Sequence, residues 1–319
     1  MQPLEPVRLD DVRAAAARLS DVALLTPLLR LEGEAPAEIH LKLESLQPTG
    51  SFKVRGAGNA LAMADPDLLA DGLATASAGN MGRAVAWLAK VRGIPATVVV
   101  PDDAPAAKLE PIASLGARIV RVTWDEWWQA LVDRGHPALS GCFVHPFADP
   151  VVMAGNGTIG LEIVDRLPDV DALVVPFGGG GLSCGIAATM KALRPDVRVF
   201  AAEVATAAPL AASFEAGHPV AVDRIPSFVD GIGGRGMLPE MWPLASSVLD
   251  GSIVVSVEEV ADALRLLATR NRVIAEGAGA AALAAALTGR AGNGRVVAVI
   301  SGGNIDLNAV STILRGGLP

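Results

Sequence analysis

Short runs of β-branched residues alternate with alanine-rich runs along most of this chain, and this alternation limits the folds that it can adopt. The strand-like runs cover residues 96–100, 118–122, 172–176, 197–201 and 296–300. The predicted helices cover residues 54–63, 84–92, 106–115, 182–193, 257–270 and 278–287. Because strands that alternate with helices usually lie parallel in one sheet, the pattern predicts an α/β fold with parallel sheets.

The overall charge and hydrophobicity narrow the functional classes. Hydrophobic residues make up 51% and charged residues 19% of the 319 residues, as in a globular protein with a large core. The formal net charge of −8 and the lack of a basic run argue against nucleic-acid binding. The longest charge-free apolar run, residues 277–289, is too short to cross a membrane. Residues 1–11 lack an apolar signal core and the only cysteines are Cys142 and Cys184, so we expect a cytoplasmic protein without disulfides.

The segment around Lys53 combines a turn with the start of a predicted helix. Residues 48–50 are Pro-Thr-Gly, which favours a turn, and Ser51 is expected to cap the helix. The positive end of a helix disfavours an ammonium group in its first turn. A lysine there is therefore suited to act as a neutral amine that forms a Schiff base. These residues alone leave a solvated lysine as an equal alternative.

A run of four glycines joins a predicted strand to a predicted helix. It consists of Gly178, Gly179, Gly180 and Gly181, followed by Leu182. Glycine backbones can curl so that their N–H groups point at an anion, and the helix N-terminus adds its dipole, so the run predicts a phosphate cradle. The alternatives are a turn without a ligand and a dinucleotide fold, because Glu203 ends the next strand near the position of a ribose-binding acid. No window fits G-x-G-x-x-G, since Ser183 and Cys184 stand where the third glycine is required, and this favours a monophosphate.

Two further polar runs also follow predicted strands. Ser301 comes directly after residues 296–300, so its hydroxyl is expected at the carboxyl end of a strand, where ligands bind in α/β sheets. The other run follows a small-residue segment, residues 73–76, and consists of Ser77, Ala78, Gly79 and Asn80. A turn of this kind at a helix start exposes N–H groups that suit a carboxylate. Simple helix capping is the alternative for both serines.

Together and in this order, residues 47–57, 77–82, 178–182 and 301–304 resemble motifs of the fold-type II pyridoxal-phosphate enzymes, specifically the threonine/serine dehydratase and serine racemase group. The resemblance extends from Thr26 to the end of the chain. It implies a tryptophan-synthase-β-like α/β fold with two open, parallel-rich sheets and pyridoxal 5'-phosphate in an interdomain cleft. It also implies a large domain of residues 1–62 and 148–319, a small substrate-closing domain of residues 63–147, and a homodimer.

The resemblance assigns roles to the motif residues. It makes Lys53 the catalytic residue that binds the cofactor, with Phe52 beside it, and residues 178–182 the phosphate cradle. Asn80 would contact the phenolic oxygen of the cofactor and Ser301 its ring nitrogen, while residues 77–80 would bind the substrate carboxylate. Because a serine hydroxyl can donate to an unprotonated nitrogen, the ring would delocalise a carbanion less, which suits elimination.

Departures from the family pattern bear on the reaction. Ala78 stands where racemases commonly have a serine that supplies a proton on the opposite ring face, and residues 145–147, His-Pro-Phe, resemble the dehydratases. Met81 replaces a frequent histidine. The sequence therefore predicts a pyridoxal-phosphate ammonia-lyase of amino-acid catabolism that converts a β-hydroxy amino acid such as L-threonine or L-serine into a 2-oxo acid and ammonia. The alternatives are a serine racemase of the same fold, a nucleotide-binding oxidoreductase, and a cofactor-binding protein without catalysis.

Three minor features complete the predicted site. Some relatives bind a cation through a glutamate and a nearby downstream acid; Glu203 matches the glutamate, but no acid follows within residues 204–214, so it is only a possible ligand. Trp124, Trp127 and Trp128 are spaced as on one helix face, which predicts packing or an aromatic wall beside a bulky β-substituent. We also expect Arg55 and Glu276 to lie next to the residues that contact the cofactor and to support them without contacting it.

Overall fold

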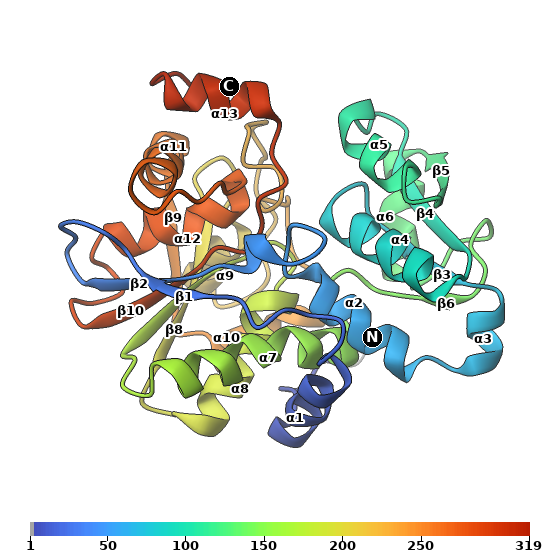
Figure 1. The fold of residues 1–319 in the computed structure, drawn as a ribbon, viewed down its shortest axis with the longest axis horizontal. Coiled ribbons are helices and arrows are strands. Elements are labelled where there is room, and N and C mark those ends of the chain that lie inside the picture. Colours follow the sequence, from blue (N-terminus) through green and yellow to red (C-terminus); the bar gives the residue numbers. More distant parts are fainter. Residues whose placement is uncertain (1–2) are drawn as a thin grey trace.

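Two sheets organise the chain in the computed structural model, which describes residues 3–319 (Figure 1). The six-stranded large sheet has the order β1-β2-β10-β7-β8-β9, and the four-stranded small sheet has the order β5-β4-β3-β6. The strands are β1 Leu28–Arg30, β2 Glu38–Lys42, β3 Leu73–Ala76, β4 Ala96–Pro101, β5 Arg118–Val122, β6 Cys142–Phe143, β7 Ala172–Pro176, β8 Arg198–Val204, β9 Ser252–Val255 and β10 Arg295–Val299. Every neighbouring pair is parallel except β1 and β2. The predicted α/β fold with two parallel-rich sheets is confirmed.

The helices cover the faces of both sheets. They are α1 Leu9–Arg18, α2 Lys53–Met63, α3 Pro66–Ala70, α4 Asn80–Arg92, α5 Ala106–Ala113, α6 Trp124–Val132, α7 Pro150–Arg166, α8 Gly181–Leu193, α9 Pro209–Ala216, α10 Met241–Val248, α11 Val257–Leu266, α12 Gly277–Leu287 and α13 Leu307–Leu314, with a short 3₁₀ turn at Glu44–Leu46 and a π turn at Leu267–Asn271. We call the segment from α3 to β6 the small-sheet part and the rest the large-sheet part. Helix α2 packs against α4 of the former and α7 of the latter, so it lies at their junction.

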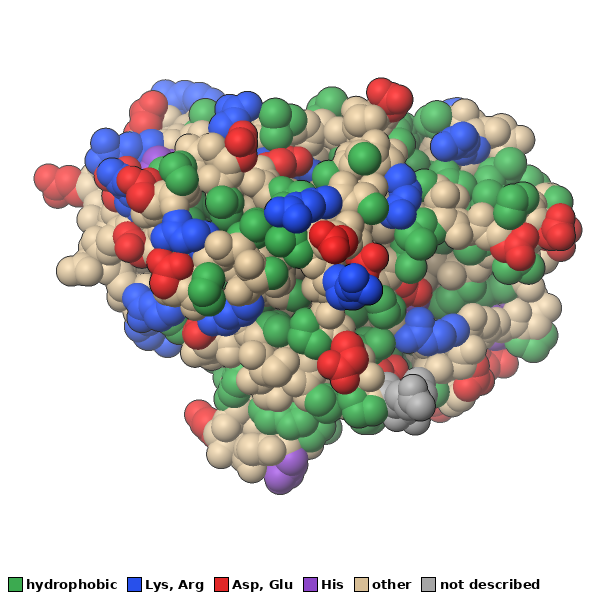
Figure 2. All heavy atoms as spheres, turned by 90° about the horizontal axis from the view of Figure 1, so that it is seen from below, with side chains coloured by type: hydrophobic (Ala, Val, Ile, Leu, Met, Phe, Trp, Pro, Cys, Tyr) green, Lys and Arg blue, Asp and Glu red, His purple; other side chains and the backbone are tan. Residues whose placement is uncertain are grey.

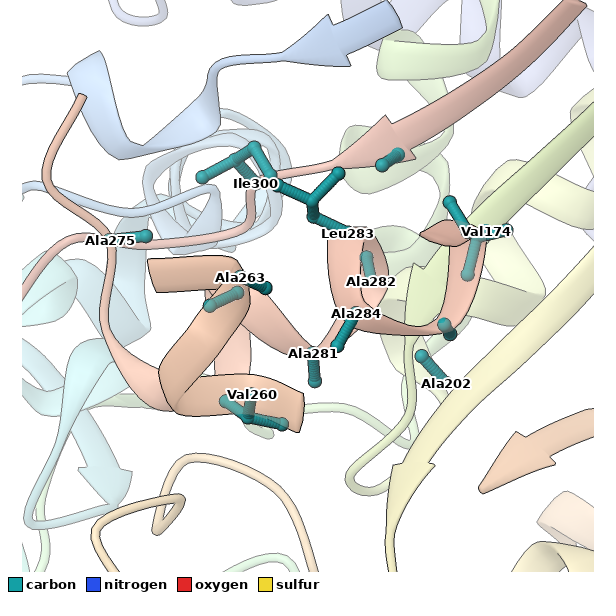
Figure 3. Close-up of a cluster of buried hydrophobic side chains, with 14 of the residues drawn as sticks. Val174, Ala202, Val260, Ala263, Ala275, Ala281, Ala282, Leu283, Ala284 and Ile300 are labelled. Carbon is teal, nitrogen blue, oxygen red and sulfur yellow. The ribbon is translucent and has the colours of Figure 1, made fainter. Parts of the chain in front are cut away.

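The large sheet separates two hydrophobic clusters because neighbouring residues of a strand face opposite sides. In β7, Val174 faces the cluster formed with α11 and α12, whereas Leu173 and Val175 face the cluster formed with α1, α7, α8 and α10. Figure 3 shows how the alanine-rich α12 lies in the first of these, with Ala281 and Leu283 among buried side chains. Small side chains let this helix approach its neighbours closely on all sides.

Helix α7 and strand β2 were not predicted, and each has a physical reason. Three glycines interrupt the helical pattern of α7, yet they permit close packing: a Cβ at Gly155 would lie 2.5 Å from the carbonyl oxygen of Arg55. Asp149 caps this helix by accepting hydrogen bonds from Val151 and Val152 N–H. Strand β2 ends in Lys42, whose charge indicates a surface position although the side chain is buried.

The surface carries both signs of charge. On the face shown in Figure 2, Lys and Arg side chains are interspersed with Asp and Glu. Between residues 3 and 319, no helix is both long and apolar enough to span a bilayer.

Candidate active site

Parallel pairing of β2 with β10 brings the Lys53 and Ser301 segments together. Lys42 at the end of β2 lies opposite Val299 at the end of β10, so both following segments leave the same edge of the sheet. Their backbones then bond directly: Phe52 N–H donates to Ser301 O (3.0 Å), and Gly303 N–H donates to Gly50 O (2.9 Å). Two motifs that lie far apart in the sequence therefore form one continuous structure.

Lys53 is the first residue of α2, and its side chain points to the junction of the two parts. Its Nζ donates to Pro146 O and lies 4.9 Å from the ring centroid of Phe52. Burial lowers the pKa of Lys53 to about 8, while the nearby Glu276 carboxylate acts in the opposite direction. A fraction of the amine is therefore neutral near physiological pH, as a nucleophile or base requires.

The prediction that Ser51 caps α2 is wrong. Phe52 occupies the N-cap position with φ −55° and ψ −19°, and no side chain caps the helix. The Ser51 backbone is paired with Gly302 instead, which directs its hydroxyl into the interior. Among residues 3–319 this hydroxyl has no hydrogen-bond partner.

The glycine run forms a tight loop between β7 and α8. Gly180 is the N-cap of α8 with φ 91°, a conformation that favours glycine. A Cβ at Gly179 would lie 2.3 Å from Cγ of Phe147, so the ring packs directly on the loop. Within the described chain, the N–H groups of Gly178, Gly179 and Gly180 have no acceptor. These free donors at a helix N-terminus fit a phosphate group.

Asn80 begins α4 and connects to both sides of the site. The helix starts at Asn80, one turn before the predicted start at residue 84, so Asn80 itself has helical backbone geometry. Its Nδ2 donates to Glu276 Oε1 (2.8 Å), and its Oδ1 accepts from Asn304 Nδ2 (2.7 Å). Burial raises the pKa of Glu276 to about 7, with the hydrogen bond from Asn80 opposing and Asp230 reinforcing the shift.

Ser301 and the segment before Asn80 have different surroundings. Ser301 is buried, at 3% exposure, and lies two residues after the end of β10. Ser77 accepts a hydrogen bond from Gly79 N–H (3.3 Å), and Gly79, the N-cap of α4, is exposed. Ala78 is half-buried, and its methyl group packs against the hydrophobic cluster of β4 and α5.

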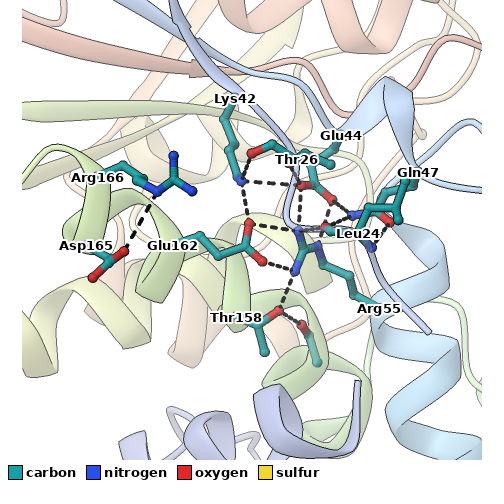
Figure 4. Close-up of polar contacts among 11 residues, drawn as sticks. Leu24, Thr26, Lys42, Glu44, Gln47, Arg55, Thr158, Glu162, Asp165 and Arg166 are labelled. Carbon is teal, nitrogen blue, oxygen red and sulfur yellow. Dashed lines mark hydrogen bonds and ion pairs between the residues drawn. The ribbon is translucent and has the colours of Figure 1, made fainter. Parts of the chain in front are cut away.

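Arg55 holds α2 in place through a buried charge network (Figure 4). Its guanidinium, 2% exposed, bonds both oxygens of Glu44 (2.8 and 2.9 Å) and Oε1 of Glu162 (2.6 Å). Lys42 adds a bond to Glu162 and another to Thr26 O (2.8 Å). Burial acts to raise the pKa of Glu44, but Arg55 and Lys42 outweigh it and hold that pKa below its usual value. The network ties α2, two residues after Lys53, to β2 and α7.

Sequence reasoning gave His145 no role at the site, but the structure places it beside Lys53. Its Nδ1 accepts from Phe147 N–H (3.2 Å) and Ala148 N–H (2.8 Å), so the ring is neutral with its hydrogen on Nε2. Burial, together with the nearby cations Arg134 and Lys53, lowers the pKa of His145 to about 3. The ring thus fixes the turn that presents Pro146 O to Lys53 and Phe147 to the glycine loop.

The tryptophans and Glu203 lie outside this centre. Trp124 and Trp128 stack on α6 with centroids 5.8 Å apart, and Trp128 packs where the clusters of both sheets meet. Glu203 is buried, at 1% exposure, and accepts bonds from Leu210 N–H (2.9 Å), Ala211 N–H (2.8 Å) and Ser252 Oγ (2.6 Å). Its oxygens therefore cap α9, and residues 3–319 hold no group of three His, Cys, Asp or Glu arranged for a metal.

Comparison with known proteins bears on this geometry. The family model described as "Pyridoxal-phosphate dependent enzyme" matches residues 19–302. The L-threonine ammonia-lyase of Thermotoga maritima is 40% identical over 318 residues, which cover 98% of this chain and 79% of that protein. The structure of maize serine racemase superposes with a TM-score of 0.89 at 30% identity and covers 98% of each chain. Threonine deaminase isoform 2 from Solanum lycopersicum superposes with a TM-score of 0.85 at 28% identity, over 99% of this chain and 98% of that one.

Proposed function

The chain belongs to the pyridoxal-phosphate dependent enzymes, and we propose that it acts as an ammonia-lyase on a β-hydroxy amino acid such as L-threonine or L-serine. The products would be a 2-oxo acid and ammonia. The observation that carries this proposal is the convergence of Lys53, the free N–H groups of the glycine loop and the Ser301 hydroxyl at one edge of the large sheet. The alternative of a dinucleotide-dependent oxidoreductase has no comparable support.

Pyridoxal phosphate is the cofactor of this family, and the residues present fit it. Lys53 would hold it through its amine, and the N–H groups of residues 178–182 would bind its phosphate, with Phe52 adjacent. Asn80 and Ser301 would contact its phenolic oxygen and ring nitrogen. The bound cofactor supplies an electron-withdrawing ring that stabilises negative charge at the substrate Cα.

The side chains of the protein would then orient the substrate and move its protons. The loop of Ser77, Ala78, Gly79 and Asn80 would bind the α-carboxylate. The amine of Lys53, with its lowered pKa, would take the proton from Cα on one face. The methyl group of Ala78 offers no donor for the opposite face, so departure of the β-hydroxyl would outpace return of a proton there.

Serine racemase remains the second candidate, because the maize enzyme superposes closely on the whole chain. A single experiment separates the two functions. Purified enzyme loaded with pyridoxal phosphate is incubated with L-threonine and L-serine, and 2-oxo acid, ammonia and the chirality of the remaining substrate are measured together. We expect 2-oxo acid to form much faster than D-serine. Equal rates would favour the racemase, and an Ala78→Ser variant should then show no further gain in D-serine.

Further proposals concern the organisation of the protein. We propose that residues 63–147 form a small domain that closes over the substrate, with residues 1–62 and 148–319 as the large domain, and that two copies associate as a homodimer. We also propose that the protein works in the cytoplasm, where Cys142 and the buried Cys184 stay reduced. Burial raises the pKa of Cys184 to about 12, which keeps this thiol unreactive.

A further inference from the structure

Four half-buried side chains form an unbroken chain of hydrogen bonds between the two parts of the molecule. Arg83 Nη1 donates to Asn304 Oδ1 (2.5 Å), Asn304 Nδ2 donates to Asn80 Oδ1 (2.7 Å), and Asn80 Nδ2 donates to Glu276 Oε1 (2.8 Å). Arg83 and Asn80 lie on α4 in the small-sheet part, whereas Asn304 and Glu276 lie in the large-sheet part. Each of the three bonds therefore joins one part to the other. We call this set the amide relay.

The ends of the relay determine the direction of every bond in it. A guanidinium can only donate, so the amide oxygen of Asn304 must face Arg83. A carbonyl can only accept, and Thr49 O accepts from the same Asn304 nitrogen (2.9 Å), which fixes this amide a second time. Asn304 must then donate to the oxygen of Asn80, and the nitrogen of Asn80 must face Glu276. The two amide orientations, which are often ambiguous, are unique here.

This orientation leaves one N–H of Asn80 uncommitted. The amide nitrogen carries two hydrogens, and only one of them is used by Glu276. If the amide were reversed, its oxygen would face the Glu276 carboxylate and its nitrogen would face the donor of Asn304. Both contacts would be unfavourable as long as Glu276 is ionised.

We propose that Arg83 and Asn304 are positioning residues that fix the Asn80 amide so that its remaining N–H faces the cofactor oxygen, and that this depends on contact between the two parts. The inference rests on the proposed function in taking pyridoxal phosphate as the ligand, but not on the substrate or the reaction. Gly50 supports it independently. Its φ is 75°, and a Cβ there would lie 2.4 Å from Asn304 Oδ1, so the turn before Lys53 leaves room for the relay only because residue 50 is glycine.

The test is a titration of the apoenzyme with pyridoxal phosphate, followed by tryptophan fluorescence and by the visible absorbance of the bound cofactor. Arg83→Leu should weaken binding about tenfold, because the charge-assisted bond that holds the Asn304 amide against α4 is lost. Arg83→Lys keeps a donor and should restore most of the affinity. Arg92→Leu makes the same chemical change at an exposed site on the same helix and should match the wild type.

Asn304→Asp changes the hydrogen-bonding groups of residue 304 without changing the size of its side chain. The new carboxylate has the same shape and gains an ion pair with Arg83, but it cannot donate to Asn80. The Asn80 amide should therefore turn over and Thr49 O should lose its donor, so that binding weakens about tenfold and the cofactor absorbance shifts.

Two results would overturn the inference: wild-type affinity and absorbance in Arg83→Leu, or the same in Asn304→Asp. A failure of the proposed function would look different. If the wild type binds pyridoxal phosphate but forms no 2-oxo acid, the substrate assignment fails and the relay stands. If the wild type does not bind pyridoxal phosphate, the proposed function fails first and the relay loses its ligand.

Discussion

The Arg55 network and the amide relay support the same site, but they differ in burial and in the kind of polar group at their centre. The Arg55 network lies within the large-sheet part and its junction helix, and its members Arg55, Glu44 and Lys42 are at most 2% exposed. The amide relay joins the two parts, its members are half-buried, and its two central groups are neutral amides. A buried ion whose partner is removed is strongly destabilising, whereas an amide that separates from another amide can bond water instead. The Arg55 network thus relies mainly on buried charges, whereas the amide relay has two neutral amides at its centre and charged groups only at its ends.

The largest effect is expected at Lys53, which lies two residues before Arg55 in α2 and close enough to Glu276 for its charge to act on the amine. Lys53→Ala removes the amine that would hold the cofactor and move the Cα proton, so turnover should fall by at least about 10³-fold. Formation of 2-oxo acid and borohydride-stable labelling of the protein measure this. Lys90→Ala, at an exposed lysine of α4, is the control. Label that persists and maps to another lysine would show that Lys53 is not the attachment point.

Breaking the Arg55 network should reduce stability. Arg55→Met leaves the buried Glu44 and the half-buried Glu162 without their shared arginine partner, so we expect the free energy of unfolding to fall by about 3–5 kcal/mol. Chemical denaturation of the apoenzyme measures this loss. Arg166→Met, which removes an exposed pair with Asp165, should have no measurable effect. Similar stability in both variants would mean that the buried charges are not what holds α2.

The contributions of Glu276 in the amide relay and of Glu44 in the Arg55 network to the free energy of unfolding should change with pH in opposite directions. The pKa of Glu276 is raised to about 7, so the folded state binds its proton more tightly, and stability is lost as the pH rises towards 7. The pKa of Glu44 is lowered, so its contribution is present above about pH 4.5 and is lost as the pH falls through its folded-state pKa.

Glu276→Gln tests the first of these signs. The difference in unfolding free energy between the variant and the wild type should grow by about 2 kcal/mol, in favour of the variant, between about pH 5 and pH 7. Denaturation of the apoenzyme at several pH values provides the measurement, and Glu258→Gln, on the exposed face of α11, is the control. A pH-independent difference would show that Glu276 does not titrate in this range.

The smallest effect is expected from a second contact between the two parts, the Lys108–Asp230 ion pair. Its nitrogen and oxygen are 2.6 Å apart, but the side chains are 40% and 46% exposed. Lys108→Met should therefore raise KM by no more than about threefold, and the difference should disappear at high salt. Lys108→Arg should behave as the wild type. A tenfold change at low salt that disappears at high salt would mean that exposed charge, rather than the amide relay, holds the two parts together.

The parts of the site that are local in sequence were predictable, and those that depend on strand register were not. Lys53 and the glycine run can each be recognised from about a dozen consecutive residues, because the turn or strand that positions each of them comes directly before it in the sequence. The amide relay joins Arg83 to Asn304, and nothing in either segment indicates the other. The Ser51 cap failed for the same reason, because the backbone of Ser51 pairs with Gly302. Strand β2 was not predicted, and the burial of Lys42 at its end is apparent only when the partners of this charge are known.

The position of β10 near the end of the chain also determines when the large sheet can be completed during synthesis. Residues 295–299 form the central partner of both β2 and β7. Until they have left the ribosome, β2 and β7 each have an unpaired edge, and the lysine segment has no Ser301 segment to join. At a synthesis rate of about 5–20 residues per second, the chain from β2 onward is exposed for on the order of ten seconds or more in this state. Unpaired strand edges favour aggregation, so the unfinished large sheet should depend on chaperones during synthesis. The small sheet should depend on them less, because all of its strands have been made by residue 143.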